Sequence, residues 1–542
     1  MPIVSNRALT GALAVALCAG LASAQVQGPS SSKTPYLLPY DTNSGVITKS
    51  IVTVGDTIGG YAMVGIPDGM GGYSNGDGTF TLLVNHELGS TLGVVRAHGS
   101  KGAFVSKWNI SSDLTVNAGE DLIKKTFLGG LPTYTEQTTA INRFCSADLP
   151  AVSAFYNSMT GKGTQERIFM NGEEAGDEGR AFANVVTGPS AGNTYVLPYL
   201  GKFSWENSVA CPVEQDTTIV MGTDDTTPGQ VYVYVGTKTD SGNDIAKAGL
   251  ANGKLYGVAV QGVTAEERLN GIGGTKRFSL PEIVNAKSLT GAALNTASNT
   301  AGVTLFLRPE DGAWDPNRPT DFYFVTTDRI DQSVLGQGPN IARSRLWRLR
   351  FDDISNPLAG GEIRAILNGT EGQQMFDNMC IDRRGFALVQ EDPGNNAYNA
   401  KIWQVDLIMG TSKIIAQHDP ARFGGLTSPA TAPYNQDEES SGIFDATDIL
   451  GTGWFLFCDQ THYSAGIPSD QVEGGQLLAL YNPQSATPAN VADINGDGEI
   501  TTADFTRFVA AFEDGSLVSD FNTDGYIDFT DFDGFVSAFE AN

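Results

Sequence analysis

The residues of this chain that could do chemistry stand where strand-like segments end. In TFTLLVNHELG, residues 79–89, an apolar run stops at Asn85, His86 and Glu87, three side chains able to hold a metal or an anion. Similar events recur in SWENS, LRPEDG, MFDNMCID and LVQEDPG, where acids lie at or near the end of a strand-like segment. We therefore expect strands that radiate from one centre to bring these acids into a shared pocket.

The ionisable residues favour hard cations over zinc. The chain has 61 Asp and Glu but only 4 His, too few and too scattered for a cluster of the HExxH kind. Oxygen ligands suit calcium above all, with iron or manganese as further options. The formal net charge of −27 argues against nucleic acid and anionic membranes as partners, and an anion site in this field needs metal ions.

Composition and strand spacing predict a mainly β protein. Charged residues make up 18% and Gly 64 of 542 residues, a balance typical of many short strands joined by turns. Clear long amphipathic helices are missing before residue 500. A β-propeller explains the size and the convergence of strand ends on one axis. A sandwich assembly is the alternative, because the sequence shows no internal repeat that would prove blades.

The first 24 residues have the pattern of a secretory signal peptide. Arg7 supplies the basic start, LTGALAVALCAGLA the apolar core and ASA the cleavage pattern, so the mature chain is expected to begin near Gln25. No later segment has the ~20 consecutive apolar residues of a membrane span. We therefore expect an exported protein, in the periplasm, outside the cell or on its surface.

Four cysteines follow this segment: Cys145, Cys211, Cys380 and Cys458. In an exported chain they could form two disulfides, and the sequence does not separate the three connectivities. The alternative for each is a buried thiol.

Residues 491–542 differ in kind from the rest. ADINGDGEITTADFTRFVAAF and SDFNTDGYIDFTDFDGFVSAF repeat one pattern, an acidic loop with EF-hand spacing followed by an apolar helix. Because neutralising the close carboxylates should permit the phenylalanines to pack, we expect a calcium-dependent module. The ligand positions are Asp493, Asn495, Asp497, the Glu499 carbonyl and Asp504 in the first loop, and Asp520, Asn522, Asp524, the Tyr526 carbonyl and Asp531 in the second.

This pair resembles a dockerin module, in which Asp rather than Glu closes each loop. The resemblance implies calcium binding and a cohesin-like partner, hence attachment to an assembly or cell surface. The alternative is a calcium-stapled cap on the main domain. The expected division of the chain is a signal peptide (1–24), an N-terminal lead (25–50), a propeller domain (51–483), a linker (484–490) and the calcium module (491–542).

The motifs between residues 50 and 465 resemble the PhoX alkaline phosphatase family. VNHE, RFCSADLP, MNGEE, GKFSWEN, FLRPEDGAWDP and FDNMCIDRRGFALVQED stand in the family's order. The resemblance implies a propeller with calcium and iron ions at its centre, and hydrolysis of phosphate esters outside the cytoplasm. At the matching positions it implies phosphate binding by Arg308 and metal ligation by Glu87, Cys145, Glu173, Glu206, Glu310, Asp377, Glu391 and Asp392.

Three positions depart from the family pattern. Trp205 replaces a histidine, Gly172 a cysteine and Phe376 a proline, while the acids stay in place.

Two further features leave alternatives open. Segment 435–448 is either another calcium site or a solvated loop, and His462 is either an acid or base at the pocket or a structural residue.

Phosphate-ester hydrolysis needs charge neutralisation on nonbridging oxygens and a planar donor, which metals and one arginine can supply. Arg308 and Glu310 are the candidate catalytic residues, with Asn85 as a second candidate contact to the substrate. The favoured function is an exported, metal-dependent phosphatase with a tail for attachment. The alternative is a noncatalytic, calcium-stabilised propeller that acts in binding or surface assembly.

Overall fold

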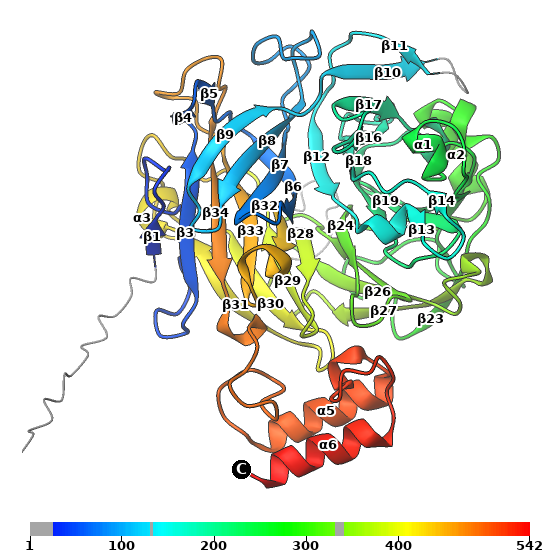
Figure 1. Ribbon diagram of the computed structural model, residues 1–542, viewed down its shortest axis with the longest axis vertical. Coiled ribbons are helices and arrows are strands. Elements are labelled where there is room, and N and C mark those ends of the chain that lie inside the picture. Colours follow the sequence, from blue (N-terminus) through cyan, green and yellow to red (C-terminus); the bar gives the residue numbers. More distant parts are fainter. Residues whose placement is uncertain (1–24, 130–133, 331–340) are drawn as a thin grey trace, which may run out of the picture.

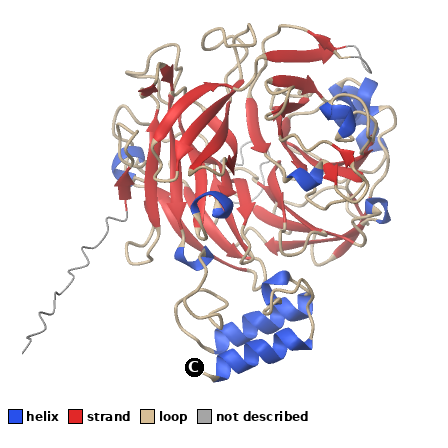
Figure 2. Ribbon diagram, viewed as in Figure 1, coloured by secondary structure: helices blue, strands red, loops and turns tan. Residues whose placement is uncertain are grey.

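The computed structural model describes residues 25–129, 134–330 and 341–542. Six β-sheets radiate from one axis, and two helices near the C-terminus lie below them (Figure 1). Strands dominate, and the longest helices belong to this tail (Figure 2). The six-bladed β-propeller confirms the mainly β prediction, whereas the predicted signal peptide lies outside the described residues.

The first three blades are formed by consecutive parts of the chain, and the strands of each blade are named from the innermost outward. Blade 1 contains β6 (Pro67–Ser74), β7 (Thr79–His86), β8 (Phe104–Ser111) and β9 (Val116–Asp121). Blade 2 contains β12 (Phe144–Asp148), β15 (Ile168–Glu173), β16 (Ala181–Val185), β17 (Asn193–Val196), β10 (Lys125–Gly129) and β11 (Thr135–Glu136). Blade 3 contains β18 (Trp205–Ala210), β19 (Thr217–Asp224), β20 (Val231–Thr237) and β21 (Lys254–Gly257).

The other three blades complete the ring. Blade 4 contains β24 (Pro309–Trp314), β25 (Asp321–Thr326), β26 (Arg345–Phe351), β27 (Gly361–Leu367), β23 (Lys276–Ser279) and β22 (Ala259–Val260). Blade 5 contains β28 (Phe376–Ile381), β29 (Phe386–Glu391), β30 (Lys401–Asp406), β31 (Thr411–His418) and β2 (Leu37–Pro39). Blade 6 contains β32 (Glu438–Asp445), β33 (Trp454–Thr461), β34 (Gly474–Tyr481), β3 (Ile47–Thr53) and β1 (Gln25–Gln27).

Smaller elements lie in the connections. Two hairpins are formed by β4 (Thr57–Ile58) with β5 (Tyr61–Ala62) and by β13 (Tyr156–Asn157) with β14 (Lys162–Gly163). The connecting helices are α1 (Asp244–Lys247), α2 (Gly291–Thr300), α3 (Pro420–Phe423) and α4 (Thr447–Leu450).

The inner strands β6, β12, β18, β24, β28 and β32 contact one another in order, and β32 returns to β6. Apolar side chains fill the spaces between neighbouring blades. Met221 of blade 3, for example, belongs to one buried cluster with Phe322 and Trp347 of blade 4. Each sheet is thus buried on both faces, which explains why so many strands have near-continuous apolar runs.

The N-terminal lead is part of the ring. Strand β2 pairs with the edge of blade 5, and β3 pairs antiparallel with β34 of blade 6, with Ile47 opposite Tyr481. The boundary expected at residue 51 therefore falls inside β3. These pairings join the two ends of the propeller chain and satisfy edges that would otherwise be open.

The four described cysteines are buried and form no disulfide. They belong to four blades: Cys145 to β12 of blade 2, Cys211 to the residue directly after β18 of blade 3, Cys380 to β28 of blade 5 and Cys458 to β33 of blade 6. Of the two alternatives left by the sequence, the structure has the buried thiol.

The tail contains α5 (Thr502–Asp514) and α6 (Phe529–Glu540), whose phenylalanines form a small core. The rings of Phe508 and Phe535 stack with centroids 4.0 Å apart. Both helices begin with a capping box, closed by Asp504 in α5 and Asp531 in α6. None of the helices in the described part of the chain has the length and apolarity needed to cross a membrane.

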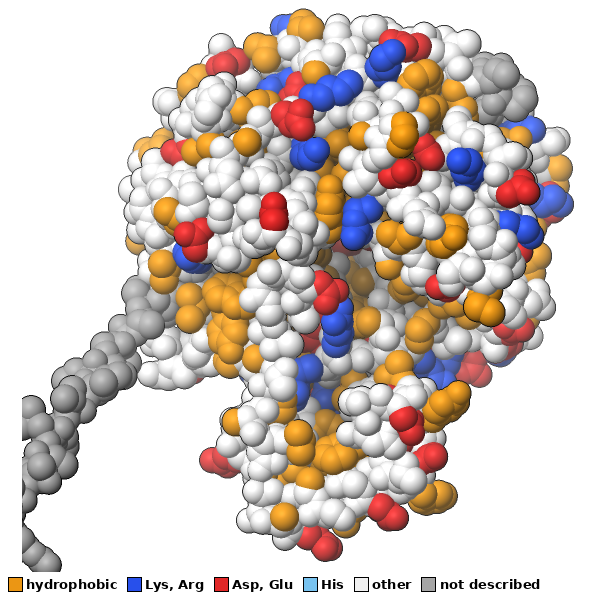
Figure 3. All heavy atoms as spheres, in the orientation of Figure 1, with side chains coloured by type: hydrophobic (Ala, Val, Ile, Leu, Met, Phe, Trp, Pro, Cys, Tyr) orange, Lys and Arg blue, Asp and Glu red, His pale blue; other side chains and the backbone are white. Residues whose placement is uncertain are grey.

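The tail docks on blades 4 and 5 through arginines. Arg507 of α5 donates to Asp406 Oδ2 (2.9 Å) and to the Arg384 carbonyl (2.6 Å). Arg350 of β26 makes two hydrogen bonds to Asp514, of 2.9 and 2.7 Å. Figure 3 shows Lys and Arg side chains where the tail meets the propeller. The expected linker therefore leads into a packed interface.

Candidate metal centre

The six inner strands share a backbone irregularity. In each, the pairing with the second strand shifts register, for example between Pro309 and Gly312 in β24. Such bulges re-aim side chains. The residue before the strand is also left-handed in four blades, with φ of 50° for Ile66, 49° for Arg143, 65° for Arg308 and 47° for Met375.

The second residue of every inner strand is an acid or a cysteine. Because the inner strands form a closed ring and begin at the same end of the axis, these side chains belong to one level of it. They come from blades 1 to 6 in order: Asp68, Cys145, Glu206, Glu310, Asp377 and Glu439. Blade 6 differs in one respect, since its bulge lies three residues later, between Ser441 and Phe444.

Asp68, Glu87 and Cys145 form the first group able to hold a cation. One ligand atom of each lies within 4.8 Å of the others. Gln460 of β33 donates to Asp68 Oδ2 (3.1 Å), while the buried Asp68 Oδ1 has no hydrogen-bond partner among the described residues. Burial and the Glu87 carboxylate raise the pKa of Asp68 well above its usual value. A bound cation would offset this repulsion.

Glu206, Asp225 and Glu310 form the second group, with the same 4.8 Å limit. The two groups touch, because Cys145 Sγ donates to Glu206 Oε2 at 3.0 Å. Burial raises the pKa of Glu206 to about 7. Glu310 Oε2 is buried and has no partner in the described structure. Close carboxylates with unused buried oxygens fit hard cations.

Arg308 lies at the edge of the second group. Its Nε donates to Asp225 Oδ1 (2.6 Å) and is 2.7 Å from Glu310 Oε1. Burial raises the pKa of Asp225, but the Arg308 guanidinium prevails and holds it below the usual value. The Arg308 side chain remains 25% exposed.

Two predicted ligands from blade 5 differ in their surroundings. Asp377 lies beside Glu206 and Asp392, and burial together with these carboxylates raises its pKa well above normal. Glu391 is instead enclosed by protein donors. Its oxygens accept hydrogen bonds from Trp403 Nε1 (2.8 Å) and from the backbone N–H of Gln374 (2.8 Å) and Lys401 (3.0 Å).

Glu173 and Asn85 are likewise engaged within the protein. Arg180 donates to both Glu173 oxygens, at 2.6 and 2.7 Å. The neighbouring Glu174 lies near the carboxylates of Glu87 and Asp225. Asn85 Nδ2 donates to the Cys145 carbonyl at 2.5 Å, and its Oδ1 accepts from Asn171 Nδ2 at 2.9 Å. Through these bonds Asn85 helps to fix the position of β12, the strand that contains Cys145.

Sequence reasoning missed Asp68, Asp225 and Arg143 as members of the site. It noted Glu439 only as part of segment 435–448, although Glu439 lies beside Asp392 and Asp377. The missed signal is an acid or cysteine in the second position of an inner strand. It is the third letter of IPDGM, RFCSA, SWENS, RPEDG and MFDNM, because each string begins one residue before its strand. It becomes visible as a repeat only when the blades are aligned.

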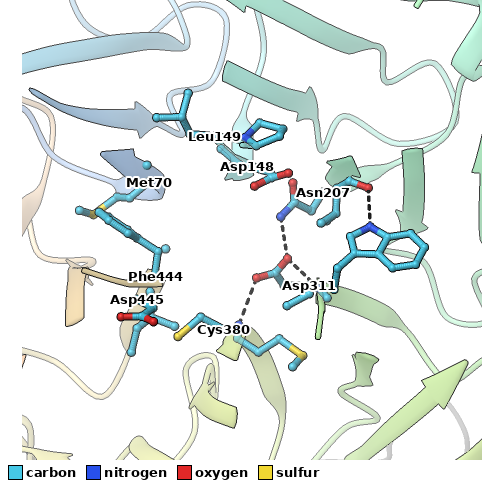
Figure 4. Close-up of a pocket in the computed structure, with 18 of the residues that line it drawn as sticks. Met70, Asp148, Leu149, Asn207, Asp311, Cys380, Phe444 and Asp445 are labelled. Atoms are coloured by element: carbon cyan, nitrogen blue, oxygen red, sulfur yellow. Dashed lines mark hydrogen bonds between the residues drawn. The ribbon is translucent and has the colours of Figure 1, made fainter. Parts of the chain in front are cut away.

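A cavity of about 290 Å³ lies further along the inner strands (Figure 4). Its lining includes Asp148 and Cys380, which come late in their strands. The Asn207 Nδ2 group donates to Asp311 Oδ1 at 2.6 Å. Burial raises the pKa of Asp148 to about 7 and that of Asp311 to about 6. The acid level and this cavity therefore occupy successive levels of the axis.

The two acidic loops of the tail have matching hydrogen bonds. Asp493 Oδ2 accepts from the Gly498 N–H and Asp520 Oδ2 from the Gly525 N–H, both at 2.9 Å. The two glycines have φ of 91° and 85°, a left-handed conformation that favours glycine. Asp504 is fully buried where the first loop joins α5. Asp493 and Asp520 thus each close the turn of their own loop.

Comparison with known proteins gave a family match for part of the chain and a similar fold among solved structures. Residues 193–419, fewer than half of the chain, match the sequence model of the family "Alkaline phosphatase PhoX". No curated protein matched the chain by sequence.

Among solved structures, PhoX of Pseudomonas fluorescens in complex with vanadate, a transition state analogue, has a similar fold. The TM-score is 0.56 at 12% identity, covering 82% of this chain and 96% of that chain. The NanB sialidase of Streptococcus pneumoniae gives a TM-score of 0.33 at 8% identity, covering 78% of this chain and 70% of that chain. The family match, with the shared propeller, supports a phosphoric ester hydrolase.

Proposed function

We propose that this protein is an exported, metal-dependent phosphatase whose active site is the ring of acids at the start of the inner strands. The observation that carries the proposal is the convergence of both carboxylate groups with Arg308, which provides cation ligands and an anion donor in one place. The similarity of residues 193–419 to PhoX points to the same chemistry.

Calcium and iron are the cations that we propose for this centre. Asp68, Glu87 and Cys145 would hold one, and Glu206, Asp225 and Glu310 another, because the ligand atoms within each group already lie within 4.8 Å of one another. Bound cations would supply charge neutralisation and a polarised oxygen nucleophile. Cys145 adds a thiolate, which suits iron better than calcium.

Arg308 would bind the phosphate group of the substrate. Its Nη1 has no partner among the described residues, whereas Nε is held by Asp225 and Glu310. The two carboxylates therefore orient the guanidinium, and its Nη1 can donate to a nonbridging oxygen. Because these oxygens gain charge in the transition state, Arg308 contributes more there than in the ground state.

Hydrolysis of a chromogenic phosphate monoester by the chain from Gln25 onward tests the proposal. Activity should require added calcium and iron, disappear with a chelator, and fall by about 10²–10³ in Arg308→Ala. Arg277→Ala provides the control, because Arg277 also pairs with a carboxylate, Asp352, at the exposed outer edge of blade 4. An unaltered rate in Arg308→Ala, or no hydrolysis with both metals present, would favour the noncatalytic binding propeller.

The tail, by our proposal, binds calcium in both loops and attaches the enzyme to a cohesin-like partner. The matched loop geometry supports calcium binding. The side chains of Tyr526 and Phe529 are 75% and 76% exposed, which leaves apolar surface on the second loop for a partner. Export would bring the protein to the calcium-rich side of the membrane.

A further inference from the structure

Arg143 occupies the position in blade 2 that Arg308 occupies in blade 4. Each residue directly precedes the inner strand of its blade and has a left-handed backbone, with φ of 49° and 65°. The other left-handed residues at this position are Ile66 and Met375. The left-handed conformation therefore occurs with and without an arginine, so the guanidinium in blade 2 is a separate property of the site.

The two arginines use their guanidinium groups in the same way. Arg143 Nε donates to Glu87 Oε1 at 2.8 Å, and its Nη2 bonds Glu174. Like Arg308, it makes no bond through Nη1 to the described residues. Its side chain is 47% exposed. Because Glu87 is only 8% exposed, the pair also compensates a buried carboxylate. The unused Nη1 is suited to an incoming anion.

One pair of carboxyl groups connects the two arginines. Glu174 bonds Arg143, Asp225 bonds Arg308, and the carboxyl groups of Glu174 and Asp225 are close enough to affect each other's ionisation. The two guanidinium groups are thus linked through the carboxyl groups of Glu174 and Asp225. A ligand spanning these carboxyl groups could meet both arginines at once.

We propose that Arg143 is a second anion-binding residue, which selects phosphate esters carrying another anionic group near the scissile phosphate. The inference rests on the proposed phosphatase function, in which Arg308 binds the scissile phosphate. When cations bind Glu87 and its neighbours, these carboxylates are neutralised and the charge of Arg143 becomes available to the ligand. Esters with a single anionic group would use Arg308 alone.

Binding of phosphonates, which cannot be hydrolysed as esters, provides the test. The full chain from Gln25, loaded with calcium and iron, would be titrated calorimetrically with methylphosphonate and with phosphonoacetate, 3-phosphonopropionate and 4-phosphonobutyrate. At least one carboxyl-bearing ligand should bind about tenfold more tightly than methylphosphonate, as one added charge-assisted contact predicts. Arg143→Gln should abolish this preference and change methylphosphonate affinity less than about threefold, and Arg143→Lys should keep part of it.

Three comparisons make the result decisive. Arg308→Gln should weaken all four ligands, and Arg277→Gln should weaken none. Metal content and melting temperature of Arg143→Gln should equal those of the parent protein. The proposal is overturned if the parent shows no preference, or if Arg143→Gln loses metal or weakens all ligands equally, which would make Arg143 a structural partner of the acids. Absence of ester hydrolysis would refute the phosphatase proposal alone, because the phosphonate preference is measured without turnover.

Discussion

A carboxylate is available to a cation only when its oxygens are not already used by the protein. Glu310 and Glu391 look alike in sequence, since each follows an apolar strand-like run. In the structure, Glu310 Oε2 is buried without a partner among the described residues. The oxygens of Glu391 accept bonds from a tryptophan and two backbone N–H groups. The first has unused ligand capacity and the second is a structural anchor of blade 5.

This difference predicts opposite effects for two conservative substitutions. Glu310→Gln should lower the metal content of the purified protein and the phosphatase rate by about tenfold or more, because a neutral amide is a weak ligand. Glu391→Gln should keep its metal and lower the free energy of unfolding by about 1–3 kcal/mol, because an amide cannot accept all of these bonds. Elemental analysis and denaturant unfolding distinguish them, and metal loss only in Glu391→Gln would contradict the assignment.

One buried helix side chain makes several of the contacts that join the tail to the propeller. Arg507 of α5 is 1% exposed and bonds Asp406, the Ile494 carbonyl and the Arg384 carbonyl. Because Ile494 belongs to the first acidic loop, this loop contributes directly to the interface. Calcium in that loop should therefore stabilise docking as well as the tail itself.

Arg507→Ala should accordingly weaken the docking of the tail without unfolding the propeller. Breaking a buried ion pair costs about 3 kcal/mol, so we expect faster proteolysis near residues 484–490 and a separate melting transition for the tail. Arg383→Ala is the matched control, because Arg383 forms an exposed pair with Asp448 and its loss should cost less than about 1 kcal/mol. Equal protease resistance in both variants would show that the docking depends on other contacts.

Ring closure concentrates buried acid at the centre of the whole molecule. Six inner strands each bring an acid or a thiol to one level of the axis, and Asp148 and Asp311 follow at the next. Their mutual repulsion and desolvation oppose folding when the carboxyl groups are ionised. The packing between blades and the closure by β3 must outweigh this cost.

The stability of the chelated protein should therefore fall as the pH rises from about 5 to about 8. Burial raises the folded-state pKa of Glu206 and Asp148 to about 7, above the unfolded value of about 4. The folded state thus binds more protons in this range, and stability is lost as these groups ionise. The buried His86, with its pKa lowered to about 3 by burial, opposes this trend only below about pH 6.5.

Melting temperatures of the chelated and metal-loaded protein, measured across this range, check the expectation. The chelated form should melt several degrees lower at about pH 8 than at about pH 5, and added calcium and iron should reduce the difference because cations replace protons as counter-charges. A melting temperature that rises with pH in the chelator would contradict the effect.

The sequence by itself determined the fold class and several parts of the site. Short apolar runs punctuated by glycine predict strands because local pattern reflects burial on two faces, and a motif such as LRPEDG places Arg308 and Glu310 together by covalent proximity. The loop spacing in the tail likewise fixes its expected ligands, since they are only a few residues apart. Each of these signals is formed by residues that lie close together in the sequence.

Only the tertiary structure decided which acids meet and which are used elsewhere. Asp68 and Cys145 are brought together by closure of the ring, and Glu391 differs from Glu310 through donors contributed by β30 and the segment before β28. The sixfold repeat was hidden because the inner strands share only a bulge and one polar position. Contacts between residues far apart in sequence depend on the packing of whole blades, which no local pattern encodes.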